Sequence, residues 1–149
     1  MTQQKLRAYE VLLRMAQVRE IRATAALARA ASEEKARRGM VSEVTDARDA
    51  VAQANARCIN GESVDLARYE MLSLLDVALA ERLHVASDQL DEATRLRSDR
   101  ANDSLLAKRY RERVDEQCDV VSLGLAHERM AKGQEEAVEL WVESRKEGA

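Results

Sequence analysis

The stretch ARCINGESVDLARYEMLSLLDVAL, residues 56–79, holds the clearest turn signal in a chain of 149 residues that contains no proline. Asn60 and Gly61 tolerate the left-handed backbone that ends a helix, and Ser63 can act as the N-cap of the next one. The sequence on both sides is rich in good helix formers. We therefore predict a first helix, a turn and a second helix over residues 3–58, 59–62 and 63–146.

The composition is typical of long helices. Charged residues make up 34% of the chain and aromatic residues only 3%, so Ala, Val and Leu must supply the buried apolar area. The formal net charge of −3 argues against general nucleic-acid binding, which needs a basic surface. No apolar run approaches the ~18 residues of a membrane span, and the start MTQQKLRAYE lacks a signal-peptide core. We expect a cytoplasmic chain without direct membrane insertion.

Heptad periodicity predicts how the two helices pair. A spacing of three and four residues, mostly apolar, runs through the first helix at Leu6, Tyr9, Leu13, Ala16, Glu20, Ala23, Leu27, Ala30, Glu34, Arg37, Val41, Val44, Arg48, Val51, Asn55 and Cys58. The second helix repeats every seven residues at Leu72, Leu79, Ala86, Ala93, Arg100, Ala107, Val114 and Val121. Its companion positions drift through Leu75, Leu83, Leu90, Leu96, Tyr110, Cys118 and Leu125, which predicts a stutter.

The predicted fold is all-α: two long helices in an antiparallel coiled-coil hairpin, a single domain over residues 1–149, with the second helix longer than the first. Folding about residue 61 would bring Met1 level with about residue 121, leaving on the order of 40 Å of helix without a partner in the chain. This overhang carries apolar side chains at Val121, Leu123, Leu125, Met130, Val138, Leu140, Trp141 and Val142. It either self-associates or frays, or it is received by another protein.

A second apolar surface lies beside the predicted turn. Leu72, Leu75, Leu79 and Leu83 face the other helix, whereas Met71, Leu74 and Val77 point away from it. A thin hairpin cannot cover such a patch itself, so it is either a docking site or a dimer contact.

Motifs for chemistry are lacking. His127 and Glu128 begin like a zinc-binding H-E-x-x-H, but Ala131 stands where the second histidine should be. Cys58 and Cys118 lie too far apart in a hairpin to form a disulfide, so we expect free thiols. A thin hairpin also lacks the concave pocket of an enzyme. We predict a non-enzymatic protein without catalytic residues, metal or cofactor.

Positive charge is concentrated near the start of the chain. Residues 1–40 contain nine Lys or Arg against four Glu, whereas residues 119–149 contain four against seven acidic residues. Arg7, Arg14, Arg22 and Arg29 form a basic strip, which is either a solvated flank or a surface for an acidic partner.

Layout and local motif together resemble the FliJ/YscO family of type III secretion proteins. The similar features are a short first arm, a turn near residue 60, the pattern Leu66-x-x-Tyr69-x-x-Leu72-x-x-Leu75 at the start of a longer second arm, and the total length. The resemblance implies a stalk-like coiled coil that links the secretion ATPase hexamer to the export gate and promotes ATPase activity and protein export. It also implies a position at the cytoplasmic, inner-membrane base of a bacterial secretion apparatus, with export chaperones as further partners.

Carried over by position, the resemblance implies two sets of contact residues. The gate-contacting tip would include Tyr69, Met71, Leu72, Leu74 and Leu75. The ATPase end would include Leu6, Leu13, Leu140, Trp141 and Val142. Because Tyr69 is the only aromatic residue around the tip, a virulence or symbiosis system is favoured over a flagellar one. The alternatives are a homodimeric structural coiled coil and an escort protein for export chaperones.

Overall fold

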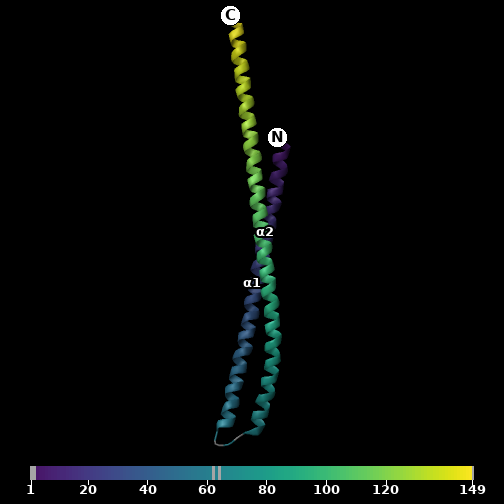
Figure 1. Cartoon of the computed structure of the whole chain (residues 1–149), viewed down its shortest axis with the longest axis vertical. Helices are drawn as coiled ribbons and strands as arrows, with labels where there is room; N and C mark the ends of the chain where they lie inside the picture. Colours follow the sequence, from purple (N-terminus) through teal and green to yellow (C-terminus); the bar gives the residue numbers. More distant parts are fainter. Residues whose placement is uncertain (1–2, 62, 64, 149) are drawn as a thin grey trace. The chain divides into compact units, whose positions relative to one another are not determined.

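The computed structural model describes residues 3–61, 63 and 65–148, and these form two long α-helices (Figure 1). Helix α1 spans Gln3–Asn60 and helix α2 spans Leu66–Glu147. The described residues contain no strand. The prediction of an all-α antiparallel hairpin with a longer second helix is confirmed.

The chain divides into two compact units. The terminal unit is Met1–Ala23 together with Ser104–Ala149, and it includes the start of α1 and the last part of α2. The tip unit is the continuous segment Thr24–Asp103. Within each unit, a segment of α1 packs against a segment of α2 that runs in the opposite direction (Figure 1).

The connection between the helices differs from the prediction in three respects. Helix α1 continues to Asn60, two residues past its predicted end. The described backbone contains no residue with positive φ, so α1 ends without the left-handed conformation expected at Asn60 and Gly61. Helix α2 is capped by Asp65 instead of Ser63, because the Asp65 carboxylate accepts a hydrogen bond from the backbone N–H of Arg68 at 3.1 Å. Helix α2 therefore begins three residues later than predicted; positions 62 and 64 lie outside the described residues.

The side chains of α1 that face α2, together with their counterparts on α2, are called the seam here. All sixteen heptad positions predicted on α1 are buried or half-buried. On α2 the seven-residue series is buried at its alanines, at Leu79, and at both valines, and only Arg100 is exposed. Small side chains dominate the most buried positions, including Ala16, Ala30, Ala86, Ala93 and Ala107. Because alanine side chains are short, the two backbones can approach closely along the seam.

The predicted stutter in α2 is wrong. Leu75, Leu96 and Tyr110 remain 46%, 44% and 44% exposed, and the less exposed side chains are those of the next residues. Those are Asp76, Arg97 and Arg111. With them the seam alternates by three and four residues from Tyr69 to Leu125, and Arg100 is the one exposed member of this series. A search for apolar residues at heptad spacing does not select these three positions, because their side chains are charged.

Charged seam residues are paired across the helices. In the terminal unit, Arg111 Nε donates to Glu20 Oε2 at 2.5 Å. This hydrogen bond is the main cause that raises the pKa of Arg111 above its ordinary value, while burial acts in the opposite direction. In the tip unit, the buried Glu34 carboxylate accepts hydrogen bonds from Arg97 of α2 and from Arg38 one turn away on α1. The pairing allows charged groups to occupy seam positions.

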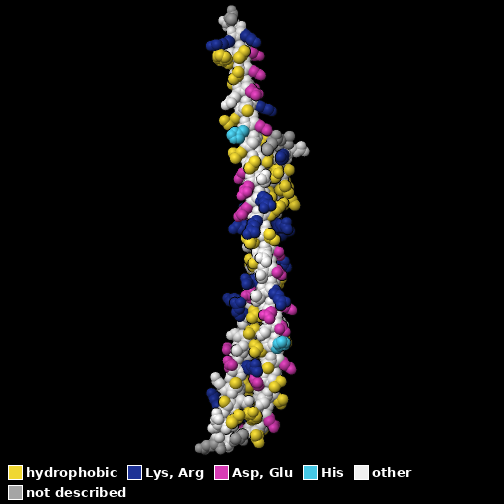
Figure 2. Space-filling view, viewed as in Figure 1, with side chains coloured by type: hydrophobic (Ala, Val, Ile, Leu, Met, Phe, Trp, Pro, Cys, Tyr) yellow, Lys and Arg dark blue, Asp and Glu magenta, His cyan; other side chains and the backbone are white. Residues whose placement is uncertain are grey.

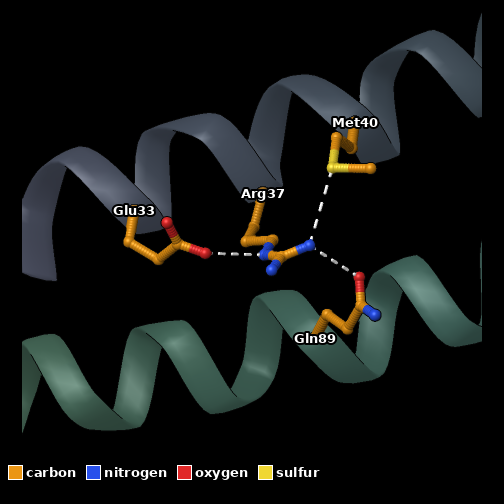
Figure 3. Close-up of polar contacts among 4 residues, drawn as sticks. All are labelled: Glu33, Arg37, Met40 and Gln89. Carbon is orange, nitrogen blue, oxygen red and sulfur yellow. Dashed lines mark hydrogen bonds and ion pairs between the residues drawn. The ribbon is translucent and has the colours of Figure 1, made fainter.

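A second polar link in the tip unit centres on Arg37 (Figure 3). Its Nε donates to Glu33 Oε1 at 2.9 Å on the same helix, and its Nη1 donates to Gln89 Oε1 of α2 at 2.9 Å. Nearer the connection, Arg48 Nε donates to Asp76 Oδ1 at 3.1 Å. The bonds to Gln89 and Asp76 each join a residue of α1 to one particular residue of α2, and together they fix the alignment of the helices in this unit.

The two cysteines are free, as predicted. Cys58 is buried in the tip unit, and Cys118 is half-buried in the terminal unit. Burial raises the pKa of the Cys118 thiol, and the carboxylates of Glu10, Asp119 and Asp115 raise it further.

Leucine at both positions of the Glu34–Arg97 pair tests its role. Arg97→Leu alone should lower the free energy of unfolding by about 1–2 kcal/mol, because it leaves a buried carboxylate with one partner fewer. Adding Glu34→Leu should restore the stability to at least the wild-type value, since two leucines continue the heptad. Arg95→Leu, on an exposed position of α2, serves as the control and should change stability by less than about 0.5 kcal/mol. Urea unfolding at fixed protein concentration measures the free energy of unfolding. A double variant less stable than Arg97→Leu alone would contradict this role.

Alkylation of Cys118 tests the direction of its pKa. In a Cys58→Ser variant, the rate of reaction with iodoacetamide reports the thiolate fraction of Cys118 alone. Because the folded environment raises this pKa, the rate of the folded protein should rise at higher pH than that of the urea-unfolded protein. Coinciding pH profiles would show that the folded environment does not disfavour the thiolate.

Candidate functional site

The residues predicted near the tip lie at the start of α2. Met71 and Leu74 are 64% and 73% exposed, and Val77 is exposed on the same side, as predicted. Tyr69 and Leu72 are half-buried against α1. Leu75 was expected to face α1 but is 46% exposed, since Asp76 occupies the seam position. The surface defined by Met71, Leu74, Leu75 and Val77 is called the tip patch below.

Local hydrogen bonds hold the first turns of α2 beneath the tip patch. The backbone N–H of Tyr69 donates to the Asp65 carbonyl at 3.0 Å, and Ser73 Oγ donates to the Tyr69 carbonyl at 2.9 Å. With the Asp65 cap, these bonds give the patch a regular helical backbone. Three or four exposed apolar side chains spaced along one helical face can pack against an apolar groove or helix of a partner.

The five residues predicted for the ATPase end fall into two separate groups in the structure. Leu6 and Leu13 are half-buried in the seam of the terminal unit. Glu20 pairs with Arg111 across the helices. Leu6 lies two heptads before Glu20, and Leu125 lies two heptads after Arg111, so in this antiparallel pair Leu6 is level with Leu125. Leu140, Trp141 and Val142 are exposed and lie at least ~20 Å further along α2 at about 1.5 Å per residue. One small partner surface cannot contact both groups.

The overhang of α2 begins later than predicted. Val121 and Leu125, which the sequence placed in it, are buried, and residues 126–148 are exposed throughout. Helix α2 continues past the start of α1 in this unit (Figure 1). Beyond Leu125 the seam positions are occupied mainly by charged residues, namely Glu128, Lys132, Glu135 and Glu139. The seam ends at Leu125, because Leu6, which lies level with it, is the first heptad position of α1.

The overhang is defined from here on as residues 126–148, and it carries the single tryptophan, Trp141. Trp141 is more than half exposed, and the guanidinium of Arg145 lies 4.2 Å from the centre of its ring. Ser144 Oγ donates to the Trp141 carbonyl at 2.8 Å. The indole is thus partly covered by a cation and otherwise open to solvent, an arrangement that suits an interface anchor.

A third apolar surface was missed by the sequence analysis. Val11, Met15 and Val18 of α1 are exposed, and hydrophobic side chains gather along this part of the helix (Figure 2). The signal was present as a second heptad offset from the seam, which a search for one apolar stripe per helix does not detect. Arg7, Arg14 and Arg22 of the basic strip are exposed in the same unit, and Arg29 is exposed in the tip unit.

The described residues offer little for other kinds of site. Across residues 3–61, 63 and 65–148, no group of three or more His, Cys, Asp or Glu side chains is placed to hold a metal ion. Neither α1 nor α2, as far as the structure describes them, has a segment both long and apolar enough for a membrane span. The candidate functional features are therefore exposed apolar surfaces on helices.

Comparisons of the chain with protein-family models, with curated proteins and with solved structures find no match. The class that the structure itself defines is an antiparallel two-helix hairpin with exposed apolar side chains in both units.

Substitution of the tip patch tests which side chains face away from α1. Met71→Glu with Leu74→Glu should leave helicity nearly unchanged, because both side chains are already exposed. Leu72→Glu with Leu79→Glu should lower it, since a half-buried and a buried leucine are replaced by charges. Far-UV circular dichroism compares the two pairs, and equal losses would show that the faces have been misassigned.

Proposed function

We propose that this chain is a non-enzymatic, stalk-like component of a bacterial type III secretion system, similar to the FliJ/YscO proteins. In this role it links the hexameric secretion ATPase to the export gate, and it promotes ATP hydrolysis and protein export. The observation that carries the proposal is the overhang, an exposed length of helix with Leu140, Trp141 and Val142 on its surface. Such a helix needs a receiver, and the pore of a ring-shaped ATPase has the shape to accept one.

The tip patch supports the second half of the proposal. A linker needs a contact surface for each of its two partners, and the tip patch and the overhang belong to different units. Met71, Leu74 and Leu75 are the exposed members of the proposed gate contact. Tyr69 and Leu72, which are half-buried against α1, hold this part of α2 in place.

At the ATPase end, the two groups of residues have different roles in the proposal. Leu140, Trp141 and Val142 contact the ATPase directly, whereas Leu6 and Leu13 join α1 to α2 at the base of the overhang. The protein would act at the cytoplasmic, inner-membrane base of a virulence or symbiosis apparatus, where export chaperones are also within reach. It requires no cofactor, because it acts by binding alone.

A homodimeric structural coiled coil is the second candidate function. The observation that favours it is also the overhang, since two exposed apolar helices can cover one another. Dependence of Trp141 emission on the concentration of the protein alone would support this alternative over the stalk.

Trp141 reports directly on the proposed ATPase contact. Titration with the purified secretion ATPase encoded nearest to this chain should shift its emission to the blue and protect it from acrylamide quenching, because the pore replaces water around the indole. The ATPase rate should rise in the same titration. An unchanged spectrum at saturation, with binding established by sedimentation, would remove Trp141 from the interface.

Two variants separate the proposed contacts. Deletion of residues 126–149 should weaken ATPase binding while the remaining hairpin stays folded, because the described residues beyond Leu125 are exposed. Met71→Glu with Leu74→Glu should retain ATPase binding and lose binding to the gate protein. The stalk proposal requires both results; a tip variant that loses both partners would argue against separate contacts.

A further inference from the structure

Helix α1 carries a second heptad stripe in the terminal unit. Its positions are Val11, Met15, Val18 and Arg22, spaced by four, three and four residues, and all four are exposed, with Met15 at 65%. A helix that packs only against α2 needs one apolar stripe, and Ala16 and its seam neighbours already provide it. A second stripe with coiled-coil spacing is typical of a helix that has another helical neighbour.

Helix α2 carries a second stripe as well, and this one runs from the paired part of the helix into the overhang. Its exposed apolar members are Leu106, Tyr110, Val120, Val138 and Trp141. The complete series alternates four and three residues without interruption: Leu106, Tyr110, Arg113, Gln117, Val120, Gly124, His127, Ala131, Gln134, Val138, Trp141 and Arg145. On the overhang this series contributes Ala131, Val138 and Trp141 as apolar members, whereas the seam positions are mainly charged.

Residues of both stripes line one groove of the terminal unit. A groove of about 540 Å³ is lined by Met15 and Val18 from α1 and by Tyr110 from α2, among other residues. The guanidinium of Arg19 lies 6.0 Å from the centre of the Tyr110 ring, at the limit of a cation–π contact. An apolar floor shared by two helices is the geometry into which a third helix packs.

The charges around this groove decide the chemistry of its occupant. Its described lining includes Arg14, Arg19 and Arg22 and no carboxylate. Both stripes also lack Asp and Glu at their heptad positions, and their charged members are all arginines. A second copy bound through the same face would set these arginines against one another, which is unfavourable.

We propose that this face of the terminal unit binds an amphipathic helix of another protein whose apolar heptad is flanked by Asp or Glu. The apolar residues of that helix pack on Met15, Val18 and Tyr110, and its carboxylates pair with Arg14, Arg19 and Arg22. This third helix lies along the second stripe of α2 and completes a local three-helix bundle with α1 and α2. This inference does not rest on the secretion function.

Synthetic helices test the proposal without any knowledge of the natural partner. The acidic probe is a peptide of about 28 residues with Leu at heptad positions a and d and Glu at e and g, and the basic probe has Lys at e and g. Like charges at e and g keep each probe from pairing with itself. Fluorescence anisotropy of the labelled probes measures binding to the full chain, and circular dichroism verifies that each variant is folded.

The acidic probe should bind at least about tenfold more tightly than the basic probe. Met15→Glu with Val18→Glu should weaken its binding by about tenfold or more, whereas Leu74→Glu in the tip patch should have no effect. Replacement of Arg14, Arg19 and Arg22 by Glu should reverse the preference, so that the basic probe binds more tightly.

Three results would overturn the proposal. Equal affinity for both probes would remove the charge selection, and absence of binding at high micromolar concentration would remove the docking site. Sedimentation of the chain alone gives the third: a dimer that Met15→Glu with Val18→Glu converts to a monomer would make a second copy the occupant. None of these results involves the ATPase or the gate protein, so failure here leaves the stalk proposal open to its own test.

Discussion

The structure depends on a single constraint, the alternation of three and four residues at which α1 and α2 face each other. Charged residues stand at several of these positions, and those that are buried or half-buried are accommodated because each finds a partner on the other helix. Glu20 with Arg111 in the terminal unit and Glu34 with Arg97 in the tip unit are the clearest cases. Without such pairing, a charge at a seam position would favour solvent over the neighbouring helix.

The fold could be predicted from sequence because composition and periodicity agreed along nearly the whole chain. The errors arose where the deciding interaction was polar. Hydrophobicity favoured Leu96 and Tyr110 over the adjacent arginines. The ion pairs that bring those arginines into the seam were not apparent, because their partners lie far away in sequence. The start of α2 was misplaced for a similar reason, since Ser63 and Asp65 are both good N-caps and only the observed hydrogen bond distinguishes them.

The candidate surfaces were predictable to different degrees. Exposure of Met71 and Leu74 followed directly from their angular positions on a helix. The overhang was expected, but its start depended on the alignment of the helices and hence on the misplaced turn. The second stripes of both helices were missed because a polar–apolar mixture containing Arg22, Gln117 or His127 looks like an ordinary solvated face until its exposure and spacing are considered together.

The alanine-rich seam has a mechanical consequence. Shallow side chains interlock weakly, so packing alone offers little resistance to sliding of one helix along the other by a whole heptad. Such a slip would preserve most apolar pairings, yet it would move Glu20 from Arg111 to the level of Ser104 or Cys118. Glu34 would likewise leave Arg97 for the level of Leu90 or Ser104. The paired charges therefore favour one alignment of the two helices over alignments shifted by a heptad.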